Sequence, residues 1–272
     1  MLLRVMRLLV VASVIVWAAA PARSATIPVE NASFEAPVID PCSFPVLPYV
    51  AQWREIDLDV ENSTNTGIFI NTPPGSPDRL LNADSNQLAF LGSAQGNGFE
   101  QDLDSVYKVG CAYRLTVGVG VSMKFPPSTS EPIDTIELVL YYLDDSNTVD
   151  IVRSTVEAME PSSFLQDYWT DLPTVETGDN WAGKNIGVAI RATGLPGGFW
   201  VLDNVRLKEM PPPDFTGDYF VNLEDLAVMA QEWQSCMGTT DLTGDGCVNV
   251  EDLMILAESW LETVQHYCCL NK

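Results

Sequence analysis

The sequence has few histidines and few basic residues for its length. There is one histidine, His266, and there are 14 basic residues against 37 acidic ones. A single histidine near the carboxyl end excludes Ser-His-Asp and Cys-His catalytic groups from the rest of the chain, unless His266 reaches them. The excess of negative charge repels nucleic acids and anionic membranes, so we expect neither as a partner.

Long apolar runs are also scarce. Residues 8–20 form one apolar stretch after Arg4 and Arg7, and at about thirteen residues it is too short to span a membrane. Small residues at Ala22 and Ser24 complete the pattern of an export signal. We therefore expect residues 1–24 to be removed and the mature protein, with no membrane insertion, to be secreted or held at the cell surface.

Paired C-x-x-C motifs are absent, which argues against a zinc site. The even number of cysteines in an exported chain predicts disulfides instead. They are Cys42, Cys111, Cys236, Cys247, Cys268 and Cys269. The sequence does not decide how they pair, although Cys42 with Cys111, and the other four among themselves, is the preferred arrangement.

Residues 25–208 are rich in short β-forming runs between Gly, Pro, Asn, Asp and Ser clusters, and they show no helical period. Leu115, Val117, Val119 and Val121 alternate with polar or small residues, as in a strand with one buried face. The expected strands are 113–122, 136–142, 87–91, 99–103, 148–156, 168–175, 185–191 and 199–208. This pattern predicts a mainly β fold in which two sheets form a sandwich.

A proline-rich segment at residues 209–213 ends the β pattern and is expected to be a linker, because consecutive prolines remove backbone donors. Beyond it, residues 214–233 and 241–260 are identical at roughly 11 of 20 positions. Each copy has oxygen-bearing side chains at loop positions 1, 3, 5, 9 and 12, the spacing of a calcium-binding loop, and position 7 offers a backbone carbonyl. The expected ligands are Asp214, Thr216, Asp218, Phe220, Asn222 and Asp225, and Asp241, Thr243, Asp245, Cys247, Asn249 and Asp252.

Each loop leads into a predicted helix with one apolar stripe, and we expect the two helices to pack together around Trp233 and Trp260. Threonine at position 3 reduces the ligand charge relative to an ideal EF-hand loop, and aspartate at position 12 replaces the longer, bidentate glutamate. Tyr219 replaces the turn glycine of the first loop, whereas the second keeps Gly246. The second loop is therefore the stronger calcium site, and Asx-rich turns without metal are the alternative.

The strings D-F-T-G-D-Y-F-V-N-L-E-D-L and D-L-T-G-D-G-C-V-N-V-E-D-L resemble the two calcium segments of type I dockerins. The resemblance implies that residues 214–272 form a small all-α module that binds a cohesin-type protein. Family members read cohesin through small hydroxylated residues at loop positions 10 and 11. This chain has Leu223, Glu224, Val250 and Glu251 there. A module kept for stability or surface assembly is the alternative.

The strings N-A-S-F-E, which ends at Glu35, and F-W-V-L-D-N-V-R-L, which contains Asp203, bracket the β region. They are similar to the first and last strands of jelly-roll carbohydrate-binding modules with a galactose-binding-like fold. The resemblance implies polysaccharide binding, and it implies a structural calcium ion held by Glu35 and Asp203. A hydrogen-bonded buried Asp203 without metal is the alternative.

Aromatic side chains on a solvent-facing side of a strand are the natural contacts for a sugar ring. Tyr141 and Trp200 lie opposite the apolar faces of their predicted strands, and core packing is their alternative role. We expect an exported, non-catalytic, calcium-binding protein that binds carbohydrate through its sandwich. A structural or adhesive surface protein is one alternative, and a glycoside hydrolase, which needs only two carboxylates, is the other.

Overall fold

The computed structural model describes residues 25–40, 46–56, 65–77, 79–123, 125–130, 132–210, 213–216, 220–236, 238–243 and 245–261. The strands are β1 (Ala25–Ile27), β2 (Val46–Leu47), β3 (Arg54–Ile56), β4 (Thr66–Ile70), β5 (Gln87–Gly92), β6 (Gly98–Val106), β7 (Ala112–Val121), β8 (Thr135–Asp144), β9 (Asn147–Glu157), β10 (Gln166–Leu172), β11 (Asn185–Ala192) and β12 (Phe199–Met210). The helices are α1 (Leu223–Gln231) and α2 (Val250–Glu258).

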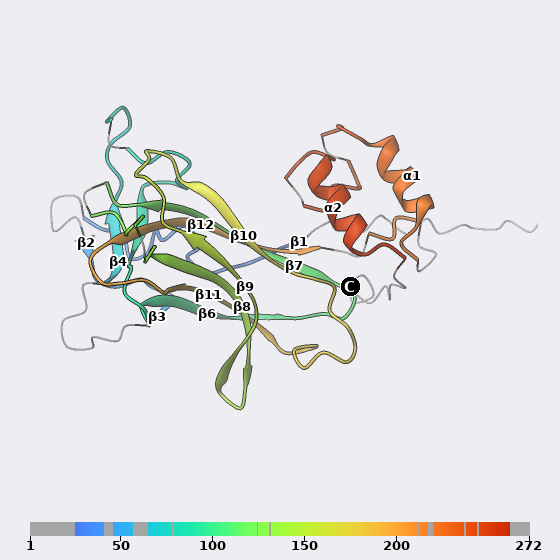
Figure 1. Cartoon of the computed structure of the whole chain (residues 1–272), viewed down its shortest axis with the longest axis horizontal. Helices are drawn as coiled ribbons and strands as arrows, with labels where there is room; N and C mark the ends of the chain where they lie inside the picture. The colour runs from blue at the N-terminus through green and yellow to red at the C-terminus, as the bar shows by residue number, and fades with distance from the viewer. Residues whose placement is uncertain are drawn as a thin grey trace, which may run out of the picture.

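The strands form two antiparallel sheets that pack as two layers (Figure 1). The seven-stranded sheet has the order β10-β7-β12-β5-β4-β2, with β1 paired to β12. The five-stranded sheet has the order β3-β6-β11-β8-β9. The predicted β-sandwich is confirmed.

All eight predicted strands are present, and four short strands were not predicted. β1, β2, β3 and β4 have only 3, 2, 3 and 5 residues. Such lengths are too short for alternating hydrophobicity to stand out in a sequence. They pair because neighbouring strands already present free backbone groups at their edges.

The space between the sheets is filled by the alternating apolar residues of the long strands. Leu115, Val117 and Val119 of β7, and Leu138 and Leu140 of β8, are all fully buried in one continuous cluster. Residues between them in the sequence point outward, as the two-residue period of a strand requires. The core therefore follows the sequence pattern along β7 and β8.

In β12 the alternation changes phase at a β-bulge, where the pairing with β7 shifts between Asp203 and Arg206. Asn204 has a φ of 53°, a left-handed conformation that adds one residue to the strand. Trp200 is therefore fully buried in the core between the sheets, and the expectation that it faces solvent is wrong. Val205 is also in this core, whereas Val201 belongs to a separate cluster.

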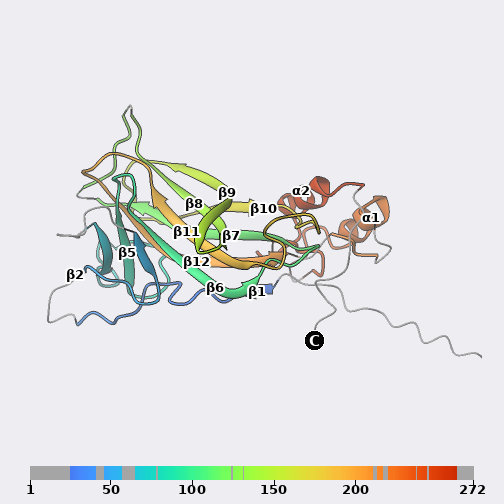
Figure 2. The same cartoon turned by 90° about the horizontal axis from the view of Figure 1, so that it is seen from below.

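The C-terminal helices lie beside the β7, β10 and β12 end of the sandwich, as Figures 1 and 2 both show. β12 extends to Met210, two residues into the segment predicted as a linker. Each helix has 9 residues, and no helix in the described ranges is long and apolar enough to cross a membrane.

A glycine on β11 provides a direct test of packing on the outer face of the five-stranded sheet. A Cβ at Gly187 would lie 2.1 Å from Cε2 of Tyr141. Gly187→Ala is expected to lower the free energy of unfolding by about 1–3 kcal/mol, because the tyrosine ring must move. Gly178→Ala is the control, since a Cβ there meets nothing within 4 Å. Equal urea midpoints for the two variants would contradict this packing.

Candidate functional site

A network of charged side chains around one tyrosine covers the outer face of the five-stranded sheet. Gly187 of β11 pairs with Asp102 of β6 on one side and with Tyr141 of β8 on the other, and Tyr141 pairs with Asp150 of β9. The Tyr141 hydroxyl donates to Oδ1 of Asp102 at 2.7 Å. We call this set the sheet network; its other members are Arg54, Glu100, Glu137, Arg153 and Arg191.

The arginines of the sheet network hold its carboxylates in place. Nη2 of Arg191 lies 2.8 Å from Oε1 of Glu100, and Nη1 lies 2.8 Å from Oδ1 of Asp150. Arg54 forms ion pairs with Glu100 and, at 3.2 Å, with Asp102. The Glu100 side chain is only 7% exposed, whereas that of Asp102 is 38% exposed. Asp102 is thus a carboxylate that a ligand can reach.

Tyr141 lies at the centre of this face. It points away from the core between the sheets, but it is fully buried, so the expectation that it faces solvent is wrong. The guanidinium of Arg191 covers its ring at 5.9 Å from the centroid. Burial, together with the hydrogen bond and charge of Asp102, raises the pKa of Tyr141 far above that of a free tyrosine. Its hydroxyl therefore stays protonated and is a fixed donor to Asp102.

A second group of carboxylates, which we call the acidic node, contains Glu35, Asp84 and Asp203. Oε1 of Glu35 accepts hydrogen bonds from the backbone N–H groups of Asn86 at 2.7 Å and Gln87 at 2.6 Å. Oδ2 of Asp203 accepts one from the Asp84 N–H at 2.6 Å. The predicted pair, Glu35 and Asp203, thus meets at one loop, although the two residues are far apart in the sequence.

Asp203 is an unusual carboxylate because it is fully buried and its Oδ1 atom has no hydrogen-bond partner among the described residues. Burial, and more weakly the charges of Asp84 and Glu35, raises its pKa to about 7. A buried carboxylate in this state needs a proton or a cation. Calcium prefers carboxylate and carbonyl oxygens, so the residues present fit this ion.

The turn that presents Glu35 is held in a specific conformation by Asn31. The Asn31 Nδ2 group donates to the carbonyls of Ala36 at 2.8 Å and Ala51 at 2.9 Å, and its Oδ1 accepts from the Ala36 N–H at 2.9 Å. Asn31 and Phe34 have positive φ angles of 49° and 55°. Asparagine tolerates this conformation well, which explains its place in the N-A-S-F-E string.

The two C-terminal repeats have the same local structure. In the second repeat, Asp252 accepts from the Thr243 N–H through Oδ1 and from the Asn249 N–H through Oδ2, both at 2.8 Å. The equivalent contacts in the first repeat join Asp225 to Thr216 at 3.0 Å and to Asn222 at 2.9 Å. Asn222 and Asn249 each cap a helix in a capping box. The sequence repeat is therefore a structural repeat of loop and helix.

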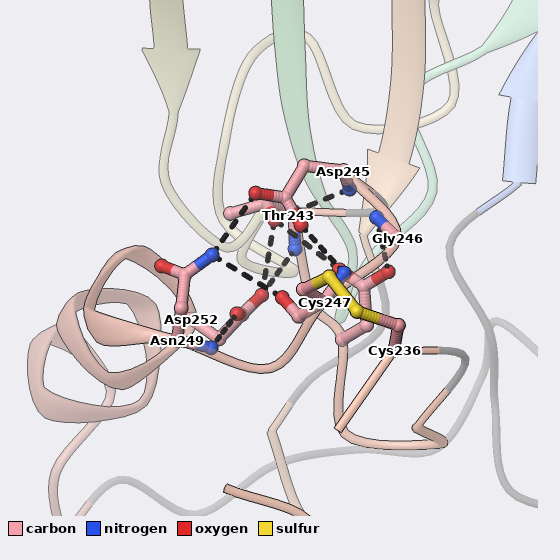
Figure 3. The surroundings of a disulfide bond; sticks show 8 residues. Cys236, Thr243, Asp245, Gly246, Cys247, Asn249 and Asp252 are labelled. Carbon is pink, nitrogen blue, oxygen red and sulfur yellow. Dashed lines mark hydrogen bonds between the residues drawn. A yellow bond between two sulfur atoms is a disulfide. The ribbon is translucent and has the colours of Figure 1, made fainter. Parts of the chain in front are cut away.

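Oxygen atoms of the predicted ligands converge in the second loop (Figure 3). The Thr243 hydroxyl lies 3.2 Å from Oδ1 of Asp241 and 3.1 Å from Oδ1 of Asp252. The Asn249 Nδ2 group donates to Oδ2 of Asp245 at 3.0 Å and to the carbonyl of Cys247 at 3.2 Å. Hydrogen atoms of Thr243 and Asn249 thus separate acceptors that a cation would otherwise draw together.

The first loop is described in part. The Thr216 hydroxyl lies 3.2 Å from both Asp214 and Asp225, and the Asn222 Nδ2 group lies 3.5 Å from the Phe220 carbonyl. Asp218 and Tyr219 lie outside the described residues. Within the described ranges, no group of three or more His, Cys, Asp and Glu side chains is arranged to hold a metal ion.

The two repeats exchange backbone hydrogen bonds. The Gln234 N–H, just after α1, donates to the Val248 carbonyl of the second loop, and the Leu261 N–H, just after α2, donates to the Val221 carbonyl of the first, both at 2.8 Å. The helices end before the tryptophans, so Trp233 is 41% exposed and does not share in the core as predicted. Trp260 does pack against that core, whose buried residues are Val221, Met229, Leu242, Val248 and Leu256.

Three of the described cysteines are disulfide-bonded. Cys236, after α1, is bonded to Cys247 in the second loop (Figure 3). This agrees with the expected pairing of C-terminal cysteines among themselves. Cys111 is also disulfide-bonded, while its predicted partner Cys42, together with Cys268 and Cys269, lies outside the described residues.

The sequence reasoning missed most of the sheet network and Asp84. The sequence did contain a sign of the sheet network, namely charged residues at outward positions of otherwise apolar strands, such as Glu100, Asp102 and Arg191. Only strand register, which a single sequence does not give, shows that these charges are neighbours.

Comparisons with known proteins relate residues 25–208 to a family of enzymes. The HpiC1-like family, described as HpiC1 cyclase, matches these residues. The apo form of a cyclase from Fischerella sp. has 21% identity, a TM-score of 0.52, and covers 70% of this chain and 98% of its own. The Stig cyclase Fisc from Fischerella sp. TAU, in complex with (3Z)-3-(1-methyl-2-pyrrolidinylidene)-3H-indole, has 18% identity and a TM-score of 0.53, and covers 70% and 99%.

A structure named CBM4 has 12% identity and a TM-score of 0.41, and covers 67% of this chain and 99% of its own. A TM-score this low carries no functional argument. A search of curated proteins found no significant match.

The family match overturns the expectation of a non-catalytic protein. Its description is that of a cyclase, and the match covers the whole predicted sandwich. Residues 25–208 contain no histidine, and this had excluded only those reactions that depend on histidine. The chain belongs to the HpiC1-like family of cyclases.

Proposed function

We propose that the sandwich is a ring-closing enzyme and that its substrate binds over Asp102 and Tyr141 of the sheet network. The observation that carries the proposal is the buried Tyr141 hydroxyl, which donates at 2.7 Å to a carboxylate that is 38% exposed. Ring closure is an isomerisation, so it needs no oxidant or reductant. It needs groups that accept a proton from one substrate atom and return it to another.

Asp102 is the group that would exchange the proton in this proposal. Tyr141 and Arg54 fix its two carboxylate oxygens at 2.7 Å and 3.2 Å, so its position is set before substrate arrives. The sheet network has four carboxylates, of Glu100, Asp102, Glu137 and Asp150, against three arginines, so it keeps a net negative charge. That charge stabilises positive charge that builds up on the substrate, while the Asp102 carboxylate takes the proton that one substrate atom loses and returns it to the atom that gains a hydrogen. The indole compound bound to Fisc makes a small unsaturated heterocycle the first substrate class to test.

Asp102→Asn is expected to reduce the rate of ring closure by about 100-fold or more, because a positioned proton-transfer group contributes roughly that factor. Tyr141→Phe should reduce it less, since the carboxylate remains. The assay follows alkenyl indoles by chromatography and mass spectrometry, because a ring-closed product has the mass of its substrate. Asp104→Asn, at the next outward position of β6, is the matched control. Equal rates for Asp102→Asn and Asp104→Asn would reject the assignment.

We further propose that calcium binds at the acidic node. Glu35 and Asp203 would hold the ion with Asp84 close by, and the bound charge would stabilise the loop that covers this part of the seven-stranded sheet. The unpartnered Oδ1 of Asp203 supports this site. The resemblance of the bracketing strings to calcium-binding sandwich modules is in agreement with it.

Asp203 gives the protein a specific dependence on pH when calcium is removed. Its pKa is about 7 in the folded state, against 3.8 for an aspartate side chain in water, so the folded state binds this proton more tightly. The contribution of Asp203 to stability is therefore present below pH 4 and is lost as pH rises through 7. In EDTA, Asp203→Asn should show a smaller loss of urea midpoint between pH 5 and 7.5 than wild type does.

Millimolar calcium should raise the midpoint of wild type at pH 7.5 by more than that of Asp203→Asn, because only the ionised carboxylate binds the ion at the acidic node. The Asp104→Asn variant is the control for a lost surface charge. The site is absent if calcium raises the midpoints of Asp203→Asn and wild type by the same amount.

For the C-terminal repeats we propose calcium binding in both loops and attachment to a protein partner of the cohesin type, as the dockerin resemblance implies. The matching hydrogen bonds of the two loops support equivalent ligand roles for Asp214 and Asp241, and for Asp225 and Asp252. Polysaccharide binding stays a prediction of the other resemblance. The two aromatic residues expected to contact a sugar, Tyr141 and Trp200, are both fully buried.

Isothermal calorimetry of the full chain tests the loops directly. Asp241→Ala combined with Asp245→Ala is expected to lower the calcium stoichiometry by one, because these residues supply two of the three carboxylates among the predicted ligands of the second loop. Glu224→Gln combined with Glu251→Gln removes the same charge from helix starts outside the predicted ligand set and should keep the stoichiometry. Loss of an equal number of ions from both double variants would mean that net charge alone governs binding.

A further inference from the structure

A basic surface on the sandwich faces the second C-terminal repeat. It consists of Arg114 of β7 and Arg206 and Lys208 of β12, where Lys208 pairs directly with Arg114. Arg114 and Arg206 have acidic partners on β10, Asp171 at 2.7 Å and Asp167 at 2.6 Å. The chain has 14 basic residues against 37 acidic ones, so three basic residues at neighbouring positions are a local exception to its overall negative charge.

Lys208 connects this surface to the second loop. Its Nζ group donates to the Thr243 carbonyl at 2.8 Å, across 35 residues of sequence. Burial lowers the pKa of Lys208, whereas the negative charges of Asp241 and Asp245 raise it. Lys208 thus lies in the negative field of the same loop that is proposed to hold calcium.

Arg114 extends the contact to α2. Burial opposes its charge, yet its pKa is raised, first by Asp171 and also by Glu251 and Glu258 at the two ends of α2. The attraction between the surface and the repeat therefore involves the loop and the helix together. Figures 1 and 2 place α2 beside the ends of β7 and β10, in agreement with these contacts.

We propose that Arg114 and Lys208 form a docking surface for the second repeat of the same chain, and that calcium in loop 241–252 releases the repeat. This inference rests on the proposed calcium site. Three of the predicted ligands in this loop are carboxylates, Asp241, Asp245 and Asp252, and a divalent ion cancels two of their negative charges. The attraction for the ammonium and guanidinium groups then falls, because it depends on the same field.

The effect is reciprocal. If calcium weakens docking, docking weakens calcium binding by the same factor, because the two equilibria share one thermodynamic cycle. The Lys208 ammonium group thus takes the place of the calcium ion when calcium is scarce. The released repeat would be free to move to a partner, so attachment would depend on external calcium.

Lys208→Met in the full chain tests the proposal, because methionine keeps most of the apolar stem and removes the charge. Calorimetry should show about fivefold or tighter calcium binding at loop 241–252 than in wild type, the lower range of such couplings. Small-angle X-ray scattering should show that calcium increases the maximum dimension of wild type, while Lys208→Met is already extended in EDTA. Lys184→Met, at an exposed lysine just before β11, should match wild type.

The outcomes separate the two proposals. Absence of calcium uptake at loop 241–252 in wild type would reject the calcium site, and the inference with it. Uptake with unchanged affinity in Lys208→Met, or with unchanged dimensions on adding calcium, would reject the docking inference and leave the calcium site in place.

Discussion

Repulsion between neighbouring carboxylates is the constraint that shapes each functional region of this chain. With 37 acidic residues and 14 basic ones, most carboxylates have no cationic partner of their own. The sheet network meets the constraint with arginines, since Arg191 serves both Glu100 and Asp150. Asp203 is fully buried, and burial raises its pKa. In the repeats, threonine and asparagine hydrogens separate the acidic groups, and Lys208 approaches from the sandwich.

The sequence was sufficient for features that depend on local periodicity. The alternation in β7 and β8 predicted both the strands and their buried faces, because side chains on a strand repeat every two residues. The internal repeat likewise predicted two equivalent loops, each followed by a helix. Asp203 and Glu35 were placed together through the resemblance of their strings to a family, and the structure joins them at the Asp84–Gln87 loop.

Features that depend on pairing between distant strands were not predictable. One left-handed residue, Asn204, reverses the phase of β12 and moves Trp200 into the core, and asparagine at that position does not by itself indicate a bulge. Tyr141 points outward as its alternation requires, yet Arg191 from another strand covers it. Helix α1 ends at Gln231, before Trp233, and the backbone turns to pair with the second loop at Gln234.

The sequence did not lead us to predict an enzyme, because we weighed only two kinds of catalytic group. These were nucleophiles that depend on histidine and the carboxylate pairs of glycoside hydrolases. Ring closure needs neither of these. The group that we propose for it is the Asp102 carboxylate, whose neighbours Tyr141 and Arg54 are brought beside it by strand register. The family match therefore supplies the class of reaction, which amino-acid composition does not indicate.

The Cys236–Cys247 bond links the segment after α1 to the loop before α2. Any single hydrolysis of the backbone between residues 238 and 246 consequently leaves the two pieces covalently joined. An extracellular protease that nicks this connection would not separate the repeats, and the backbone pairing of Gln234 with Val248 would survive the cut. Tolerance of such damage is a property of connectivity alone and is independent of any bound ion.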